Sequence, residues 1–127
     1  MTEHRVLVCG GRGYDEVDRA FAVLDGLSPR PTMVIQGGNK GSWLSGRRVP
    51  GADLIAHNWA VWRGINSITY AVDHRLDGPW PAAGPRRNSR MLAGAQPHLV
   101  VALPGGRGTA DMVRRAKAAG VRVIEVR

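Results

Sequence analysis

The stretch LVVALPGGRGTADMVRRAKAAG, residues 99–120, decides the expected fold. It begins with a short apolar run typical of a buried parallel strand and ends with the spacing of a helix over 109–119. A turn rich in proline and glycine lies between them, and Thr109 is expected to cap the helix with its hydroxyl. The turn residues that we expect at a ligand site are Pro104, Gly105, Gly106, Gly108 and Thr109.

Strand and helix patterns alternate along the rest of the chain. The strands are expected at 5–11, 32–38, 66–72, 98–104 and 121–126. The helices are expected at 14–27, 52–63, 86–94 and 109–119, and the loops at 39–50 and 73–85. Such alternation predicts an α/β fold, a Rossmann-like three-layer sandwich with a mostly parallel sheet of about five strands. We expect a single domain over residues 1–127.

Composition and charge indicate the compartment and the class of ligand. The one cysteine, Cys9, cannot form an internal disulfide, which fits a reducing cytoplasm, and we interpret it as a packing residue. No signal peptide and no membrane segment are expected, so the predicted localisation is cytoplasmic without a membrane partner. The net charge of +8 comes almost entirely from arginine. It indicates either a phosphate-binding surface or a GC-rich genome.

Glycines follow three of the expected strands. They are Gly10 and Gly11, Gly37 and Gly38, and the glycines of the 105–108 turn. Because parallel strands end at one edge of the sheet, these turns are expected to form a phosphate site there. Neither the G-x-G-x-x-G spacing nor a G-K-[ST] sequence is present, which argues against a standard NAD or ATP site. No spacing suggests a metal site.

Several arginines are candidate phosphate partners. Arg12 directly follows the first glycine pair. In the 86–94 helix, Arg87 or Arg90 is expected either to reach the ligand or to belong to a solvated basic face. The cations at 114, 115 and 117 are interpreted as a solvent face near a helix C-terminus.

Four motifs together resemble a known family. They are VLVCGGRGY, GADLIAHNWA, AGPRRNSRML and VALPGGRGTADMVRRA, and they extend over Arg5 to Val126. The chain resembles the small bacterial DUF2493 proteins of the YspA/YpsA-related SLOG superfamily, with its lysine-decarboxylase-like Rossmann fold. The resemblance implies a nucleotide-type ligand at the glycine-rich edge, with Asn88 and Arg90 approaching it. Relatives include phosphoribohydrolases of nucleoside monophosphates and a DNA-processing protein that binds single strands.

The resemblance bears directly on catalysis. The phosphoribohydrolases carry PGGxGTxxE, and this chain has Met112 in place of that glutamate. Methionine transfers no proton, so hydrolysis is in doubt. Asp111 is adjacent but is expected to point elsewhere, because one residue rotates a helix by about 100°. Arg90 and Asp111 are the remaining catalytic candidates, and whether the chain is an enzyme stays open.

Other residues permit two interpretations each. Asp53 is expected either to cap the 52–63 helix or to accept a ribose hydroxyl. Trp59 and Trp62 are expected in the core or in the interface of a homo-oligomer, and Trp43 and Trp80 are better candidates for stacking. The 39–50 segment is either a lid or partner-binding loop, or a tolerated insertion.

Three functions follow from these patterns. The first is binding of a phosphorylated small molecule, a nucleotide or derivative, through the glycine-rich loops as a sensor or accessory module. No other cofactor is expected. The second is a phosphoribohydrolase cleaving the N-glycosidic bond of nucleoside monophosphates. The third, ranked last, is a nucleic-acid-binding protein.

Overall fold

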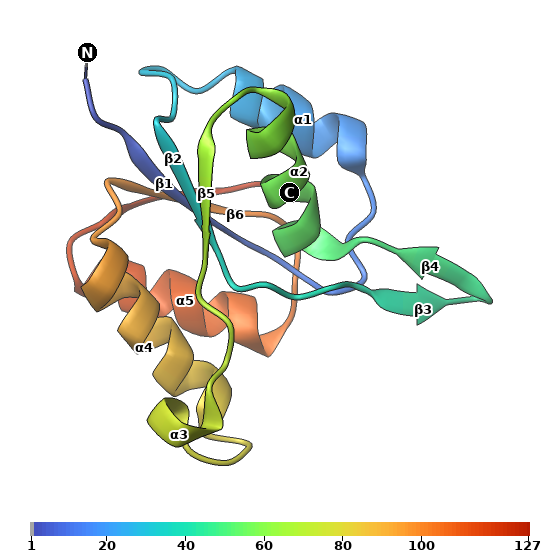
Figure 1. Cartoon of the computed structure of the whole chain (residues 1–127), viewed down its shortest axis with the longest axis vertical. Helices are drawn as coiled ribbons and strands as arrows, with labels where there is room; N and C mark the ends of the chain where they lie inside the picture. The colour runs from blue at the N-terminus through green and yellow to red at the C-terminus, as the bar shows by residue number, and fades with distance from the viewer. Residues whose placement is uncertain (1) are drawn as a thin grey trace.

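The computed structural model describes residues 2–127, and its core is a parallel sheet between two helical layers (Figure 1). The sheet strands are β1 (Arg5–Cys9), β2 (Met33–Gln36), β5 (Asn66–Thr69), β6 (Leu99–Ala102) and β7 (Arg122–Glu125). The helices are α1 (Val17–Asp25), α2 (Gly51–Trp62), α3 (His74–Asp77), α4 (Ala83–Ala95) and α5 (Arg107–Ala118). The strand order is β5-β2-β1-β6-β7 and every pairing in this sheet is parallel. The predicted Rossmann-like sandwich is confirmed.

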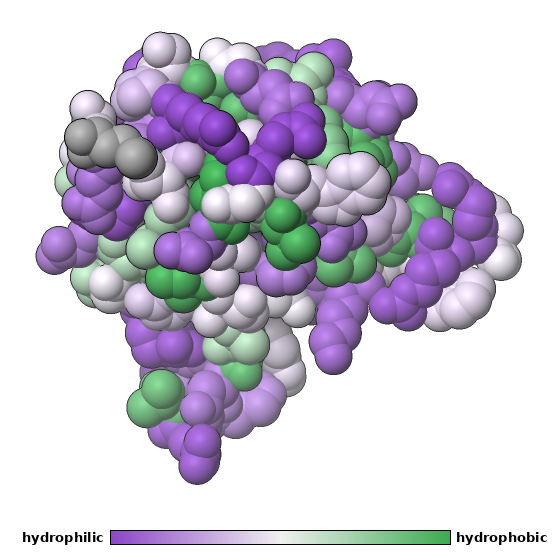
Figure 2. All heavy atoms as spheres, turned by 45° about the horizontal axis from the view of Figure 1, so that its top comes forward, coloured by the Kyte–Doolittle hydropathy of each residue, from purple (hydrophilic) through white to green (hydrophobic). Residues whose placement is uncertain are grey.

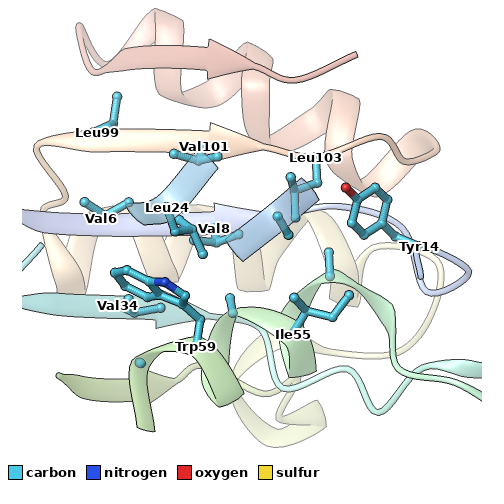
Figure 3. Close-up of a cluster of buried hydrophobic side chains, with 14 residues drawn as sticks. Val6, Val8, Tyr14, Leu24, Val34, Ile55, Trp59, Leu99, Val101 and Leu103 are labelled. Atoms are coloured by element: carbon cyan, nitrogen blue, oxygen red, sulfur yellow. The ribbon is translucent and has the colours of Figure 1, made fainter. Parts of the chain in front are cut away.

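The alternating direction of the side chains along β1 explains why helices cover both faces of the sheet. Val6 and Val8 pack in a core cluster with residues of α1 and α2, whereas Leu7 and Cys9 pack in a second cluster with residues of α4 and α5. Successive side chains of a strand point to opposite faces, so one short apolar run supplies both cores. Figure 3 shows the first cluster, which forms between the sheet and α1 and α2.

The order of the strands creates a switch point beside β1. The chain adds β2 and then β5 on one side of β1, and then crosses to add β6 and β7 on the other side. Connections leave β1 and β6 in opposite directions, so a crevice opens at the carboxyl ends of these two strands. The glycine-rich turns lie at this edge.

A β-hairpin replaces the loop predicted over 39–50. Strands β3 (Ser42–Leu44) and β4 (Arg47–Val49) pair antiparallel, and the turn residues Ser45 and Gly46 have φ of 52° and 72°. Positive φ at both positions is the geometry of a two-residue hairpin turn. The hairpin projects from the body in Figures 1 and 2. The loop prediction is wrong because strands of three residues are too short for a recognisable period.

Contacts at its base, through Ser42, and near its turn, through Arg47, fix the hairpin to the loop after β1. Ser42 Oγ donates a hydrogen bond to the carbonyl of Arg12 at 3.1 Å, and Arg47 forms an ion pair with Asp15 at 2.7 Å. Gly41 has a φ of 83°, and a Cβ there would overlap the carbonyl oxygen of Val49. The hairpin therefore leaves the body at a rigid, glycine-dependent corner. Whether it acts as a lid remains a prediction.

The predicted 73–85 loop is also partly helical. It contains the short helix α3 and the first residues of α4, which starts at Ala83 and not at the predicted 86.

Of the helical tryptophans, Trp59 is buried in the first core cluster and 1% exposed, whereas Trp62 is 78% exposed. The core interpretation is confirmed for Trp59 alone, and a homo-oligomer remains a prediction. Within residues 2–127, no helix combines the length and apolar character needed to cross a bilayer.

Candidate functional site

A cleft of about 510 Å³ opens at the switch point, where the sequence predicted the ligand edge. Its walls come from the ends of β1 and β2, the start of α2, the connection before α4, and the first turns of α4 and α5. The predicted site residues in its lining are Gly10, Gly11, Arg12, Gly37, Asn88, Gly106, Gly108, Thr109 and Asp111. Four predicted site residues do not line it: Gly38, Arg90, Pro104 and Gly105.

Some of the glycines are required by packing. A Cβ on Gly10 would lie 2.6 Å from Ala52 Cβ and 2.9 Å from Leu103 Cβ. A Cβ on Gly105 would overlap the Thr109 hydroxyl. Real Cβ atoms do not approach other atoms so closely, so glycine is needed for the strand ends and helix starts to meet. The sequence predicted a tight turn and ligand contact for these glycines, and at Gly10 and Gly105 the structure adds close packing as a reason for glycine.

Gly106 and Gly108 differ from these packing glycines. A Cβ on either would meet no atom within 4 Å, so nothing in the described chain demands glycine there. Both residues line the cleft at the start of α5. The backbone N–H groups of a first helical turn have no intrahelical partner, and no side chain at these two positions covers them. They form an open polar surface.

Thr109 does not cap α5. The helix begins at Arg107, its N-cap residue is Gly106, and no side chain caps it. Thr109 is the third helical residue, and its hydroxyl packs beside Gly105 at the cleft. The predicted cap is wrong because the glycines themselves enter the first turn, which sequence spacing does not reveal.

Two exposed arginines lie in the cleft. Arg12 follows the end of β1, and Arg107 opens α5. The sequence analysis missed Arg107, although its position inside the PGGRGT turn was the available signal. Neither guanidinium forms an ion pair with an acid of residues 2–127. Both are therefore free to bind an anion.

Arg87 lines the cleft, and its guanidinium is bonded to backbone and side-chain groups of the cleft wall. Its Nη1 donates to the carbonyls of Gly37 and Tyr70, both at 2.9 Å, and its Nε donates to Asn88 Oδ1 at 3.2 Å. A Cβ on Gly37 would lie 2.7 Å from this Nη1. Burial lowers the pKa of Arg87, while Asp53 opposes that shift. Arg87 thus joins the ends of β2 and β5 to α4.

Arg90 is directed away from the cleft. Its Nε and Nη2 donate to the two carboxylate oxygens of Asp77 at 2.9 and 2.8 Å, and Nη2 also donates to the Ala71 carbonyl. Asp77 is only 1% exposed. The hydrogen bonds from Arg90, followed by that from Asp73 N–H, lower the pKa of Asp77 to about 2. Arg90 therefore holds α3 against α4.

Asp111 does not point away from the cleft as predicted. It lines the cleft, is buried, and accepts a hydrogen bond from Asn88 Nδ2 at 3.0 Å. Arg114 and Arg115 both form ion pairs with it. The side chains of Arg114 and Lys117 are nevertheless exposed, so the solvent-face interpretation is confirmed for these two residues, while Arg115 is half-buried. Burial raises the pKa of Asp111, but the Asn88 and Arg115 hydrogen bonds outweigh it and the net pKa is lowered. Met112 is 1% exposed and packs in the second core cluster.

Asp53 is the buried acid of the cleft without an ion-pair partner among residues 2–127. It is the third residue of α2 and makes no capping hydrogen bond, so the capping interpretation is wrong. It accepts a hydrogen bond from Asn39 N–H at 3.0 Å. Burial raises its pKa, against the backbone N–H groups of Asn39 and Gly37 and the charge of Arg87. A perturbed, unpaired carboxyl in a cleft is a typical functional group.

Two further features complete the site. Trp80 lines the cleft and is 57% exposed, while the other tryptophans lie outside the lining. No group of three or more His, Cys, Asp or Glu suited to a metal ion occurs in residues 2–127. The lining thus combines free cations, open backbone amides, one unpaired carboxyl and one aromatic ring.

Comparison with known proteins places this geometry in a family. The sequence profile of the YspA, cpYpsA-related SLOG family matches residues 4–76, more than half of the chain. The chain belongs to this family. The matched part of the SLOG chain contains Arg12 and Asp53, whereas α4 and α5 lie beyond it. No curated protein matches the sequence.

A solved structure extends the likeness to nearly the whole SLOG chain. DNA processing protein A (DprA) from Streptococcus pneumoniae is similar with a TM-score of 0.72 and 20% sequence identity. The similarity covers 98% of this chain and 50% of that chain, so the SLOG chain spans half the length of this neighbour. At this identity the likeness concerns the Rossmann-like fold.

Proposed function

We propose that this SLOG chain binds a nucleotide or nucleotide-derived small molecule in the cleft, as a sensor or accessory module. One observation carries the proposal: Gly106 and Gly108 leave the start of α5 uncovered in the same cleft as Arg12 and Arg107. Uncovered N–H groups and the helix dipole attract a phosphate, and a guanidinium binds two of its oxygens. The cleft volume of about 510 Å³ is in the range of small-molecule sites.

Asp53 supplies the second polar feature that the ligand must match. The backbone N–H groups of Asn39 and Gly37 occupy only part of this buried carboxylate, which has about four acceptor sites and no cationic partner, so a further donor from a ligand would stabilise it. Asp53 lies in the lining beside Gly37 and Asn39, on a different element from Arg107. We infer that it accepts a hydrogen bond from a sugar hydroxyl of the ligand. A phosphorylated sugar unit satisfies both ends of this arrangement.

The start of α5, where the phosphoribohydrolase motif has its glutamate, favours binding over hydrolysis. Met112 supplies no carboxylate, and Asp111 is already engaged by Asn88, Arg114 and Arg115. A general acid or base needs a lone pair or proton directed at the substrate. Incubation with AMP and GMP followed by chromatography for free base tests this point, and the proposal expects none.

Thermal shift with a panel of nucleoside mono- and diphosphates tests the proposed function. A ligand at a hundredfold excess over its Kd stabilises the fold by about 2.7 kcal/mol. Gly106→Val and Arg107→Ala should remove most of the shift. Arg122→Ala is the matched control, because Arg122 is an exposed arginine on β7 outside the cleft. A panel without any shift, or an equal loss in the control, would contradict the proposal.

Nucleic-acid binding is the alternative, favoured by the net charge of +8. The name of the solved neighbour, a DNA processing protein, points the same way. A polyanion bound through surface arginines should dissociate steeply as salt rises. Binding of a single-stranded oligonucleotide that Gly106→Val does not affect would favour this alternative.

A further inference from the structure

Trp80 stands apart from the other tryptophans of the chain. Trp59 is buried, and the exposed Trp43 and Trp62 do not line the cleft. Trp80 lines it and remains 57% exposed. A large aromatic ring left exposed in a concave wall gains little from the fold itself, so its surface is available to a ligand.

The ring of Trp80 is held on two sides. The His74 ring packs against it at 5.5 Å between centroids, with an interplanar angle of 76°. On its second side the ring packs closely on the first turn of α4, since a Cβ placed on Gly84 would lie 3.4 Å from Trp80 Cζ3. A ring fixed in this way offers a stacking surface without a large cost in side-chain entropy.

The ion pair between the buried Asp77 and the half-buried Arg90 fixes the segment that carries Trp80. Asp77 ends α3, and its carboxylate accepts two hydrogen bonds from Arg90 on α4 and one from Asp73 N–H. Such a pair specifies one geometry when its hydrogen bonds are satisfied. The connection from α3 to α4 is therefore anchored at both ends, and Trp80 within it lines the cleft. Figure 1 shows α3 beside the start of α4.

The lining is chemically different at its two ends. The connection before α4 and the first turn of α4 contribute Trp80, Pro81 and Pro85, which offer an aromatic and apolar surface. Farther along α4 the lining includes Arg87 and Asn88, whose polar atoms are already bonded to protein groups. The turn after β1 and the start of α5 contribute the free guanidinium groups and the uncovered amides. A ligand that uses both ends carries an anionic group and a flat, weakly polar group.

We propose that Trp80 is the base-stacking residue of the cleft, and that the ligand is a nucleotide with its aromatic base rather than a sugar phosphate alone. This inference rests on the proposed function. It adds that the ligand carries an aromatic base, which phosphate binding alone does not require. The base stacks on the Trp80 ring while the phosphate lies at Arg107 and the open turn. Every base has a π face, so stacking selects for a base without selecting one base.

The experiment uses Trp80 as its own reporter. In a Trp43→Phe/Trp62→Phe background, emission comes from the buried Trp59 and from Trp80. AMP and GMP should quench this emission on titration, and ribose 5-phosphate should bind with little quenching. Calorimetry then compares Trp80→Ala and Trp80→Phe. Trp80→Ala should weaken AMP and GMP binding about tenfold, and Trp80→Phe should restore most of it. Neither variant should change the Kd of ribose 5-phosphate by more than about twofold, which also shows that the variants are folded.

The possible results separate the two proposals. Nucleotide-specific quenching and a nucleotide-specific loss in Trp80→Ala support base stacking. Equal Kd values for AMP and ribose 5-phosphate, unaffected by Trp80→Ala, overturn base stacking and leave phosphate binding intact. Binding of neither AMP, GMP nor ribose 5-phosphate to the parent chain overturns the proposed function, and base stacking with it.

Discussion

Asn88 on α4 and Asp111 on α5 are joined by a hydrogen bond of 3.0 Å, and both side chains line the cleft. Asn88 Nδ2 also donates to the Gly108 carbonyl at 3.2 Å. One buried amide thus fixes the distance between two helices that both line the site. Both residues were site candidates by sequence, and the structure shows that much of their hydrogen-bonding capacity is directed at each other.

Asn88→Ala should destabilise the fold by about 2 kcal/mol, because it leaves a buried carboxylate short of one donor. The free energy of unfolding from urea denaturation measures this change. Ser89→Ala is the control, since Ser89 is exposed on the same helix, and it should stay within about 0.5 kcal/mol of the parent. Equal stabilities of the two variants would show that the Asn88–Asp111 contact contributes nothing.

Two glycine substitutions should have opposite effects on stability. Gly10→Ala places a Cβ 2.6 Å from Ala52 Cβ and should cost about 1–3 kcal/mol. Gly108→Ala meets open space within α5 and should gain about 0.5–1 kcal/mol, because alanine is the better helix former. The same Gly108→Ala variant should bind nucleotides more weakly. Urea denaturation with and without nucleotide separates the two effects, and a destabilised Gly108→Ala would contradict the open geometry.

Acid should weaken the attachment of α3. The pKa of Asp77 is lowered to about 2 by Arg90, below its usual 3.8, so its stabilisation is complete above about pH 4 and lost as the pH falls toward 2. Asp77→Asn should therefore be less stable than the parent at pH 7 and lose less stability between pH 4 and 3. Urea midpoints at pH 7, 4 and 3 measure this. A residual slope is expected from Asp25, whose pKa is also about 2 because of hydrogen bonds from Arg63 and Trp59. Identical pH profiles for parent and variant would exclude the assigned role.

Cys9 should react slowly with thiol reagents in the native protein. Burial, with a smaller contribution from the charge of Asp53, raises its pKa to about 12, and the thiolate is the reactive form. Labelling with a disulfide reagent at pH 8 should be at least about a hundredfold slower than in 6 M guanidinium chloride. Rapid native labelling would mean that the cleft floor opens, and would refute the packing interpretation of this residue.

Local sequence patterns predicted the sandwich because their causes are local. The apolar runs at 5–9 and 99–102 bury both faces of a strand, and helical spacing places Leu24 and Trp59 toward the sheet. The hairpin was missed because SWL and RRV, at 42–44 and 47–49, are stabilised by cross-strand pairing and not by a hydrophobic period. Its turn residues, Ser45 and Gly46, were the available signal.

Local sequence was enough to predict the strand–helix alternation and the edge at which glycines gather, because side-chain period and glycine's backbone freedom act within a few residues. Contacts between distant segments distinguish the glycine that packing requires from the glycine that leaves space: a Cβ on Gly10 would meet Ala52 and Leu103, whereas a Cβ on Gly106 would meet no atom within 4 Å. The tertiary packing also pairs Arg90 with Asp77, whereas Arg107 lines the cleft without an ion pair among the described residues. The Arg90 guanidinium meets Asp77 because α3 packs against α4, and that approach depends on how distant segments of the chain pack.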